Sequence, residues 1–321
     1  MYPILQFGLG QWGGVLSEVT IVGSINIDLT SYLERWPQVG ETVLAKETLI
    51  SLGGKGANQA VAASRIGAKA TIVGAIGADT FGTDVEQRLR NYNVATQLSL
   101  QRTCATGMAF IDVGPDGGNI IRVSSGANAA LDSRIIEEHS RVIANSKIVL
   151  LQNEIPLEAS IRAAQIAKLS GTMVVMDPAP APVPFWPLDA LQFFDILTPN
   201  ASETKMITGH EPSSLSEGED AARKLHEYGV RGSIITMGAI GVAWSIDGKT
   251  GSTEAPKVNS VDTVAAGDCF NGAFAAAQAS GQSIAASIDI AVNAAALATT
   301  RNGAAESIPT LEELRSVMPV S

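Results

Sequence analysis

The chain has 321 residues, of which 45% are hydrophobic and 17% charged, and its formal net charge is -10. This length can bury a sizeable core in one large α/β domain or two ordinary ones, and the acidic balance argues against a nucleic-acid or anionic-membrane partner. We therefore expect a small-molecule partner. Two cysteines are too few for a disulfide framework, and no apolar run reaches the ~18 residues of a membrane span, so we predict a cytoplasmic protein without a membrane segment.

Residues 1–17 contain Gly8-Leu9-Gly10-Gln11-Trp12-Gly13, which matches the dinucleotide-binding pattern G-x-G-x-x-G. That pattern acts only between a strand and a full helix. The stretch from Gly14 to Ser17 is too short to hold a crossover helix before the next apolar run. We interpret the match as chance and residues 1–17 as an N-terminal extension. A nicotinamide enzyme built on this segment would bind NAD, which we do not expect.

From residue 18 onward, short apolar runs alternate with helical patterns. The runs predicted to be buried strands are 19–23, 70–75, 147–151, 172–177, 195–197 and 232–236. The helices predicted between them are 57–65, 84–92, 133–144, 157–169 and 220–228. This alternation predicts an α/β fold with a mostly parallel sheet covered by helices on both faces.

Two segments, 30–52 and 106–125, break this alternation, because they carry strand patterns with no crossover helix. We expect them to form a small, discontinuous β lid that could exclude water from a reaction. The core would then comprise 18–29, 53–105 and 126–321. Toward the C-terminus, we predict an antiparallel hairpin of 241–246 and 252–258 around Asp247-Gly248, followed by helices at 283–299 and 311–317.

Ser24, Asn26 and Asp28 follow the first predicted strand and share one face of an extended chain. Open α/β sheets bind ligands at the carboxyl ends of their strands. An amide and a carboxylate together can donate to and accept from the vicinal hydroxyls of a polyol or sugar. The alternative is that they are ordinary polar residues at a loop entry.

The stretch Gly53-Gly54-Lys55-Gly56-Ala57-Asn58-Gln59 precedes a predicted helix. It is not a P-loop, because Leu49 stands where the first glycine should be and neither Ser nor Thr follows the lysine. The glycines would let the backbone approach a ligand closely, and Lys55 could meet a hydroxyl or a phosphate. An ordinary Gly-Gly turn is the alternative.

Acidic and amide side chains also stand at two predicted helix starts. Asn200 and Glu203 fit a capping box, but the same pair could organise hydrated Mg²⁺ beside phosphates. Glu154 precedes Pro156, which suits the first turn of a helix. Both structural and functional interpretations stay open for these segments.

Small residues run from Val261 into Gly267-Asp268, where an Ala-rich helix begins. The first N–H groups of that helix have no intrahelical partners, and its dipole attracts anions. Ala265 and Ala266 have no bulk to keep a phosphate away. A carboxylate beside a phosphate is repulsive unless it takes a proton from an attacking hydroxyl. Asp268 is therefore either such a base or a first-turn acid that stabilises the helix dipole.

Taken together, these stretches resemble the ribokinase family of carbohydrate kinases from about Val19 to about Pro309. The motifs that carry the resemblance occur in the order GSINID, GETV, LGGKGANQAVAASRIGA, ATGMAFI, SSGANAAL, DPAPA, LTPNASE, ITMGAIGV, VDTVAAGD and TTRNGAAESIP. Fructokinases and adenosine kinases share the final Gly-Asp signature but differ at the glycine pair, where GGKGANQ is similar to the ribokinase branch. The resemblance implies a three-layer α/β/α core with a β-sheet lid.

The resemblance implies a kinase that transfers the γ-phosphate of ATP to the 5-hydroxyl of D-ribose, with Asp268 as the catalytic base. The sugar would be held by Asn26, Asp28, Gly53, Gly54, Lys55, Asn58, Glu154 and Asp268. The nucleotide would be bound by Asn200, Glu203, Thr236, Gly238, Gly241, Ala265, Ala266, Gly267 and Asn293, with Val292 as the rival of Asn293 for the adenine contact. A monovalent cation, usually K⁺, would lie at Asp262, Val264, Ala298, Arg301, Gly303 and Ser307, and Glu203 would hold Mg²⁺ through water.

Related ribokinases form homodimers, and a small lid sheet would expose edges and an apolar face that a two-fold partner could cover. We therefore expect a homodimer formed through the lid. Two alternatives stay open for the function. One is a kinase for 2-deoxyribose or another related sugar or nucleoside, and the other is a non-catalytic sensor of sugar or nucleotide. The presence of base, anion-binding helix and Mg²⁺ motif together argues against the sensor.

Overall fold

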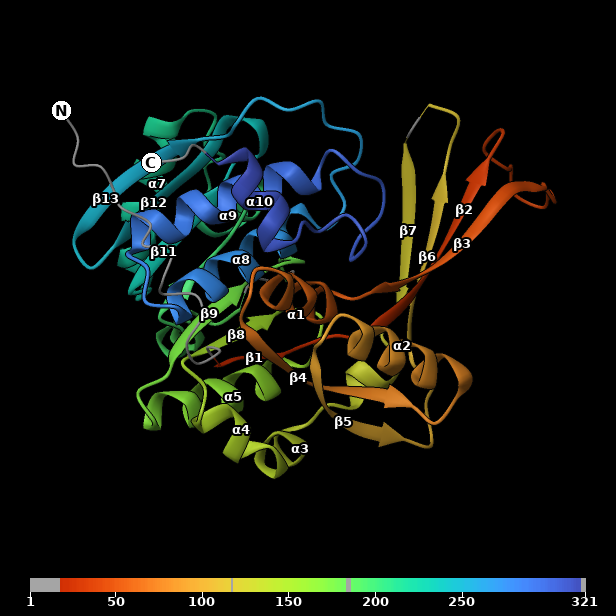
Figure 1. Cartoon of the computed structure of the whole chain (residues 1–321), viewed down its shortest axis with the longest axis horizontal. Coiled ribbons are helices and arrows are strands. Elements are labelled where there is room, and N and C mark those ends of the chain that lie inside the picture. The colour runs from red at the N-terminus through yellow and green to blue at the C-terminus, as the bar shows by residue number, and fades with distance from the viewer. Residues whose placement is uncertain (1–17, 117, 183–185, 319–321) are drawn as a thin grey trace.

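The computed structural model describes residues 18–116, 118–182 and 186–318. They form an α/β core, and a small β-sheet projects from one side of it (Figure 1). This arrangement confirms the predicted fold class. The expected N-terminal extension, with its glycine pattern, lies outside the described residues. Within these ranges, no helix combines the length and apolar character that crossing a membrane requires.

The core sheet has nine strands in the order β13-β12-β11-β10-β9-β8-β1-β4-β5. Pairing is parallel from β11 to β5 and antiparallel at the edge formed by β12 and β13. The strands are β1 (Glu18–Val22), β4 (Lys69–Gly77), β5 (Ala95–Gln101), β8 (Ile148–Gln152), β9 (Met173–Asp177), β10 (Ile196–Leu197), β11 (Gly232–Thr236), β12 (Gly241–Ile246) and β13 (Lys249–Glu254). Successive side chains of a strand point to opposite faces, so Leu150 of β8 joins one hydrophobic cluster and Leu151 the other.

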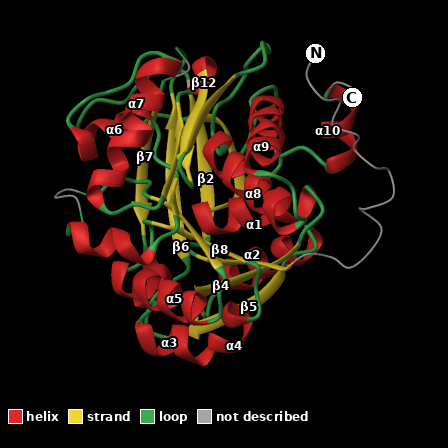
Figure 2. Cartoon of the chain, turned by 90° about the vertical axis from the view of Figure 1, so that its left-hand side faces the viewer, coloured by secondary structure: helices red, strands yellow, loops and turns green. Residues whose placement is uncertain are grey.

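Helices cover both faces of this sheet (Figure 2). The layer that packs with Leu150 contains α1 (Lys55–Arg65), α2 (Thr80–Asn91), α8 (Ala266–Ala279), α9 (Ile284–Ala298) and α10 (Leu311–Val317). The opposite layer contains α3 (Ser133–Glu138), α4 (Ser140–Ala144), α5 (Leu157–Leu169), α6 (Ala201–Thr208) and α7 (Leu215–Leu225). In the first layer α1 and α8 approach closely, because Gly272 has no side chain and a Cβ there would stand 2.4 Å from the Cβ of Ala62.

The second sheet, which we call the lid sheet, has four strands in the order β3-β2-β6-β7. They are β2 (Asn26–Leu33), β3 (Ala45–Gly53), β6 (Gly107–Val113) and β7 (Asn119–Ser124). The separate small sheet is therefore confirmed, but its first strand starts earlier than expected. Residues 26–29, assigned to the core from the sequence, pair with β3 and β6 instead of with core strands. As a result Asn26 and Asp28 belong to the lid sheet.

Other sequence-based assignments also differ from the structure. The helices predicted at 84–92 and 220–228 are Thr80–Asn91 and Leu215–Leu225. The helix predicted at 133–144 is interrupted at His139 and forms α3 and α4. The second strand of the hairpin begins at Lys249, because Asp247 and Gly248 have φ of 49° and 74° and complete the turn by themselves. Strand β5 was not predicted, because its sequence ATQLSLQ has no apolar run and lies at the edge of the sheet.

Candidate active site

Asp268 lies in the first turn of α8 and is almost completely buried. Ala265 is the N-cap residue of this helix and has a left-handed backbone with φ of 58°. The free N–H groups of the first turn of α8, together with its dipole, make this end of the helix attractive to anions. Asp268 thus stands beside a potential anion site and, being buried, needs hydrogen-bond donors of its own.

A pocket of about 220 Å³ opens at this helix end, and we call it the helix-start pocket. Residues from the sheet ends, α1, α6 and α8 form its walls. The lining residues are Lys55, Asp177, Ala179, Thr198, Asn200, Glu203, Thr236, Thr263, Ala265, Ala266, Gly267, Asp268 and Asn271. The pocket therefore brings together residues that lie far apart in the sequence, including the glycine-rich stretch and the Asn200-Glu203 pair.

Two side chains of α1 donate hydrogen bonds to the Asp268 carboxylate. Asn58 Nδ2 donates to Oδ2 over 3.0 Å, and Gln59 Nε2 donates to Oδ1 over 3.1 Å. Burial raises the pKa of Asp268, while Lys55, Asn58 and Gln59 act in the opposite direction. The carboxylate is consequently a stronger base than an exposed aspartate, and its donors still favour the ionised form.

Lys55 is the first residue of α1, and its ammonium group is surrounded by carboxylates. Burial alone would lower its pKa, but Asp268, Asp177, Glu154 and Glu203 raise the pKa above the usual value of a lysine. Lys55 therefore remains a cation at neutral pH. It supplies a fixed positive charge in a pocket whose other charged lining residues, Asp177, Glu203 and Asp268, are acidic.

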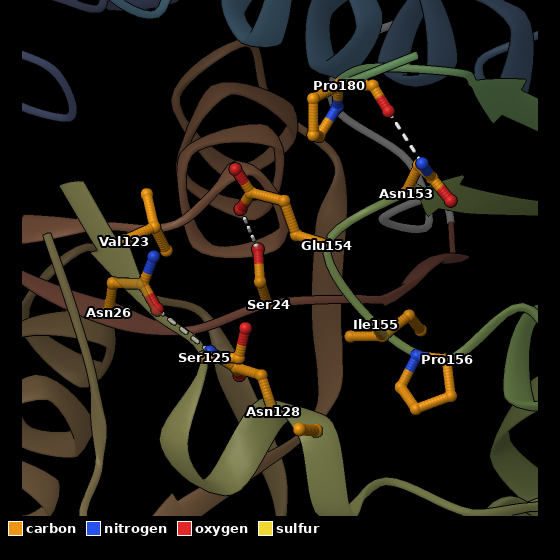
Figure 3. A pocket seen from close by; sticks show the side chains of 11 residues that line it. Ser24, Asn26, Val123, Ser125, Asn128, Asn153, Glu154, Ile155, Pro156 and Pro180 are labelled. Carbon is orange, nitrogen blue, oxygen red and sulfur yellow. Dashed lines mark hydrogen bonds between the residues drawn. The ribbon is translucent and has the colours of Figure 1, made fainter. Parts of the chain in front are cut away.

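A second pocket, of about 340 Å³, lies between the lid sheet and the loop after β8, and we call it the lid pocket (Figure 3). Ser24 and Glu154 point toward each other there, and the Ser24 hydroxyl donates to Glu154 Oε2 over 2.6 Å. Asn128 Nδ2 donates to Asn26 Oδ1 over 2.8 Å. Because that bond fixes the amide of Asn26, its Nδ2 is left as a donor for a ligand.

Asp28 is buried against Gly53, which pairs with Asn26 in the lid sheet. A Cβ at position 53 would stand 1.9 Å from Asp28 Oδ1, so only glycine leaves room for this carboxylate. Asp28 Oδ1 has no hydrogen-bond partner. Burial, together with the charges of Glu154, Glu306 and Asp268, raises the pKa of Asp28 to about 7. A buried carboxylate oxygen without a donor is suited to accept a ligand hydroxyl.

The two pockets meet at the start of α1. The backbone N–H of Lys55, which lines the helix-start pocket, donates to Glu154 Oε2 of the lid pocket over 3.2 Å. Ala179 lines one pocket and its neighbour Pro180 the other. A ligand group in the lid pocket would thus lie close to the Asp268 end of α8.

The predicted capping box at the start of α6 is confirmed. Asn200 Oδ1 accepts from the N–H of Glu203 over 2.8 Å, and Glu203 Oε2 accepts from the N–H of Asn200 over 2.8 Å. Both residues line the helix-start pocket, and Asn200 forms a parallel bridge with Thr236. The structural role and a position at a candidate ligand site therefore coexist in the same pair.

Three other residues expected at the nucleotide do not line this pocket. Gly238 and Gly241 lie just beyond β11, where both have positive φ. Asn293 is half-buried on α9 and donates to the carbonyl of Asp289 over 2.8 Å. Its rival Val292 is buried in the hydrophobic core, which leaves Asn293 as the more accessible of the two side chains.

Asp262 ties together two loops near the start of α8. Its Oδ1 accepts from the N–H of Val264 over 2.9 Å, and its Oδ2 accepts from the N–H of Gly303 over 3.0 Å. The Arg301 guanidinium forms an ion pair with Glu313 over 2.8 Å. Ala298 and Ser307 are buried. Asp262, Val264 and Gly303 are thus brought into contact.

The sequence did not point to four polar residues that line these pockets or bond to their residues. Gln59 and Asn128 make buried hydrogen bonds to Asp268 and Asn26, and Asp177 and Asn271 line the helix-start pocket. Asp177 carried a usable signal, since it is a carboxylate at the carboxyl end of a predicted strand. The other three are polar residues inside or at the start of helices, where sequence pattern alone does not distinguish a buried side chain.

Comparison with known proteins places the chain among carbohydrate kinases. The family model described as pfkB family carbohydrate kinase matches residues 16–311. A ribokinase of Haemophilus influenzae is 38% identical over 296 residues, which cover 92% of this chain and 96% of that protein. A deoxyribokinase of Salmonella typhi is 31% identical over 307 residues, covering 95% and 99%. The solved structure of Arabidopsis thaliana ribokinase complexed with ribose and ATP has a TM-score of 0.88 and 31% identity, covering 96% and 100%.

Proposed function

Because this chain belongs to the pfkB family of carbohydrate kinases, we propose that it is an ATP-dependent kinase that transfers the γ-phosphate to the 5-hydroxyl of D-ribose, giving ribose 5-phosphate and ADP. The observation that carries this proposal is the connection of Asp268 to both pockets. Asp268 borders the helix-start pocket and bonds to Asn58 on α1, the helix whose first N–H group bonds to Glu154 of the lid pocket. A base in this position can reach a sugar hydroxyl on one side and a phosphate on the other.

The sugar is assigned to the lid pocket and the residues around it. Asn26 offers a donor, whereas Asp28 and Glu154 offer carboxylate oxygens, so both sides of vicinal hydroxyls find partners. Gly53 and Gly54 let the start of α1 pack closely against Asp28 and Asn26, which holds these two residues beside the pocket, since a Cβ at Gly54 would stand 2.8 Å from the N atom of Asn26. Asn58 and Lys55 complete the set at the side that faces Asp268.

In the proposed transfer, Asp268 takes the proton of the 5-hydroxyl as the oxygen attacks the γ-phosphorus in line with the leaving oxygen of ADP. The N–H group of Gly267 at the start of α8 stabilises the charge that develops on the phosphoryl oxygens, whereas the N–H of Ala266 already donates to the Thr263 carbonyl over 3.3 Å. Lys55 adds its positive charge on the same side. The lid sheet excludes water, so that the sugar hydroxyl is the acceptor.

A kinase that uses ATP works with a divalent metal such as Mg²⁺, and the helix-start pocket fits such an ion. Its walls offer oxygen donors, and Asn271 Oδ1 is buried there without a hydrogen-bond partner. Asn200 and Glu203 would hold Mg²⁺, Glu203 through water. When bound, the ion neutralises phosphate charge.

We also assign K⁺, as an activating cation, to the loops around Asp262. The fit rests on the Asp262 carboxylate, which accepts one backbone N–H with each oxygen and so holds the loops of Val264 and Gly303 together, where their backbone oxygens could bind the ion. Ala265, Ala266 and Gly267 follow Asp262 closely, so an ordered loop here would hold the start of α8 in position. Arg301 is paired with Glu313 and would contribute its carbonyl.

Two further features of the biological setting are part of the proposal. The chain acts as a homodimer through the lid sheet, which exposes Leu49, Ile50, Phe110, Ile120 and Ile121. It works in the cytoplasm, because Cys104 and Cys269 are both unpaired, as a reducing compartment favours.

A kinase for 2-deoxyribose is the second candidate, and the similarity to the Salmonella typhi deoxyribokinase favours keeping it. The polar groups in and beside the lid pocket can bind either sugar, because Asn26, Asp28 and Glu154 indicate hydroxyl recognition without specifying the number of hydroxyl groups. A sensor without catalysis has less support, since the base, the helix start and the metal-binding residues are all present.

A coupled ADP-release assay over ribose, 2-deoxyribose, fructose and adenosine, with and without K⁺, tests these assignments. We expect the highest kcat/KM with ribose and a higher rate with K⁺ than with Na⁺ at the same ionic strength. A preference for 2-deoxyribose would establish the second candidate. Binding of ribose by calorimetry without ADP formation, at saturating Mg²⁺ and K⁺, would instead establish a sensor.

A further inference from the structure

Gln59 lies on α1, next to Asn58, and its side chain is completely buried. Its Nε2 donates two hydrogen bonds, one of 3.1 Å to Asp268 Oδ1 and one of 3.0 Å to Asp177 Oδ2. Its Oε1 accepts a bond of 2.7 Å from Nε2 of Gln152. The proposed reaction uses Asp268, but it gives no role to the other three members of this buried chain of side chains.

The partners of Gln59 determine how its amide is oriented. A primary amide has two N–H hydrogens, and here each goes to a different carboxylate. Rotated by 180°, the amide would turn its oxygen toward both carboxylates, which is unfavourable in a buried site. Gln152 holds the amide from the opposite side. Gln152 itself fits only because Gly23 lacks a side chain, since a Cβ there would stand 1.8 Å from Gln152 Oε1.

The charges around the two carboxylates explain why a shared donor matters. The ionisable groups that face them are Lys55 from α1, Glu154 after β8, Glu203 from α6, Asp28 from the lid sheet and the Cys269 thiol on α8. Only Lys55 is cationic among these groups. Burial raises the pKa of Asp177 to about 7, with Lys55 lowering and Asp268 raising it. Lys55 is thus the one charged neighbour in this set that favours the ionised form of Asp268 and Asp177, and a neutral hydrogen-bond donor shared by both carboxylates favours it further.

We propose that Gln59 is a positioning residue for phosphoryl transfer, whose amide holds Asp268 in one orientation and keeps it ionised beside Asp177. This inference rests on the proposed function, because it assumes that Asp268 is the base. With the amide in place, one oxygen of Asp268 is occupied by Gln59 and the other accepts from Asn58. The side chain is thereby restricted to the rotamer that borders the helix-start pocket. The role is separate from sugar binding, since Gln59 lines neither pocket.

The test replaces Gln59 by methionine, which keeps the approximate length and flexibility of the side chain but removes both donors. Without them, the two carboxylates repel each other and one retains a proton to a higher pH. In Gln59→Met we expect kcat near neutral pH to fall about tenfold or more, and the midpoint of the acid limb of kcat to rise by about one unit. The KM for ribose should change far less than kcat, because the sugar contacts remain.

Two further variants separate this role from a loss of packing. Gln152→Met leaves both donors of Gln59 but removes the bond that orients them, so the acid limb should move in the same direction by a smaller amount. Gln278→Met removes a half-buried amide at the far end of α8, where Gln278 donates to Ser287 over 2.6 Å, and should leave the acid limb in place. The inference is overturned if a folded Gln59→Met has the acid limb of the wild type. Should Gln59→Met fail to fold, an unshifted Gln152→Met overturns it equally.

A measurement on the ligand-free chain distinguishes failure of this inference from failure of the proposed function. Carboxyl groups whose pKa is raised on folding lower the stability of the fold as pH rises from about 4 to about 8. The difference in Tm between wild type and Gln59→Met should therefore be small at low pH and grow toward high pH. A difference that stays constant with pH would mean a loss of packing alone and would overturn the inference, whatever the sugar assay shows.

Discussion

The side-chain amide of Asn58 donates a 3.0 Å hydrogen bond to Oδ2 of Asp268 and so joins α1 to the first turn of α8. If Asp268 is the base, Asp268→Asn should lower kcat by about 10²- to 10⁴-fold. The asparagine has nearly the same shape, so calorimetry should still detect ribose binding. Asp84→Asn, which removes a half-buried acid of α2 paired with Arg88, is the matched control and should leave both quantities unchanged. Near-normal turnover in Asp268→Asn would exclude the role of base.

Gly267 faces open space at the start of α8, and a Cβ there would have no neighbour within 4 Å. Alanine should therefore fold without strain and raise the free energy of unfolding by about 0.5–1 kcal/mol, because it replaces a helical glycine. The added methyl group enters the helix-start pocket, so we expect the KM for ATP to rise about tenfold or more. Thermal unfolding and ATP titration measure the two effects. An unchanged KM for ATP would contradict the assignment of phosphate to this helix end.

Ala265 has a φ of 58°, a left-handed conformation that costs a residue with a side chain about 1–2 kcal/mol. Ala265→Gly relieves this strain but adds flexibility to the unfolded chain, so we expect the free energy of unfolding to rise by up to about 1 kcal/mol. Ala266→Gly is the control, because Ala266 is already helical and the same change should destabilise by about 0.5–1 kcal/mol. Urea denaturation measures both. Equal effects of the two variants would mean that the strain at Ala265 is not significant.

The raised pKa of Asp28 predicts that the free energy of unfolding depends on pH. Its pKa is about 7 in the fold, against an ordinary value of 3.8. A carboxyl whose pKa is raised on folding stabilises fully below pH ~4, and this contribution is lost as pH rises through about 7, at up to about 1.4 kcal/mol per pH unit. Asp28→Asn should therefore flatten the fall of unfolding free energy over that range, whereas the control Asp84→Asn should not. Urea titrations at a series of pH values measure the unfolding free energy of the wild type, Asp28→Asn and Asp84→Asn. The prediction is refuted if this free energy falls with pH at the same slope in all three proteins.

We predict that the lid sheet forms the dimer interface. Ile120 and Ile121 are 52% and 50% exposed, and they point to opposite faces of β7. If a second copy covers one of these faces, glutamate on that face should dissociate the dimer, so either Ile120→Glu or Ile121→Glu should lower the mass found by sedimentation. Leu169→Glu is the control, since Leu169 is 87% exposed at the end of α5, outside the lid sheet. A wild type that sediments as a monomer at micromolar concentration would refute the dimer.

Local sequence was sufficient wherever the structure depends on neighbouring residues. The alternation of apolar runs and helical patterns predicted the three layers, since helices and strands each have a characteristic spacing of apolar residues. The capping box of Asn200 and Glu203 followed from a spacing of three residues and is present. The helix start at Ala265-Ala266 was also predictable, because small residues before an Ala-rich run give a helix whose first N–H groups stay accessible.

Pairing between distant segments was less predictable. The sequence placed Asn26 and Asp28 at the end of a core strand, but their backbone groups pair with β3 and β6 in the lid sheet. No residue near Asn26 in the sequence indicates that the chain leaves the core sheet and pairs with the lid strands at this point. The edge strand β5 was missed for a related reason, since a strand at the edge of a sheet is only partly buried and needs no apolar run.

By itself, the sequence determined the α/β fold class, the family and the identity of the groups that could do chemistry. Only the tertiary structure decided which of those groups meet. Asp268 receives its hydrogen bonds from Asn58 and Gln59, which are 210 and 209 residues away in the chain. The raised pKa values of Asp28 and Asp177 likewise come from burial and from charges on other elements. Such contacts depend on how helices pack on the sheet, and therefore no local pattern encodes them.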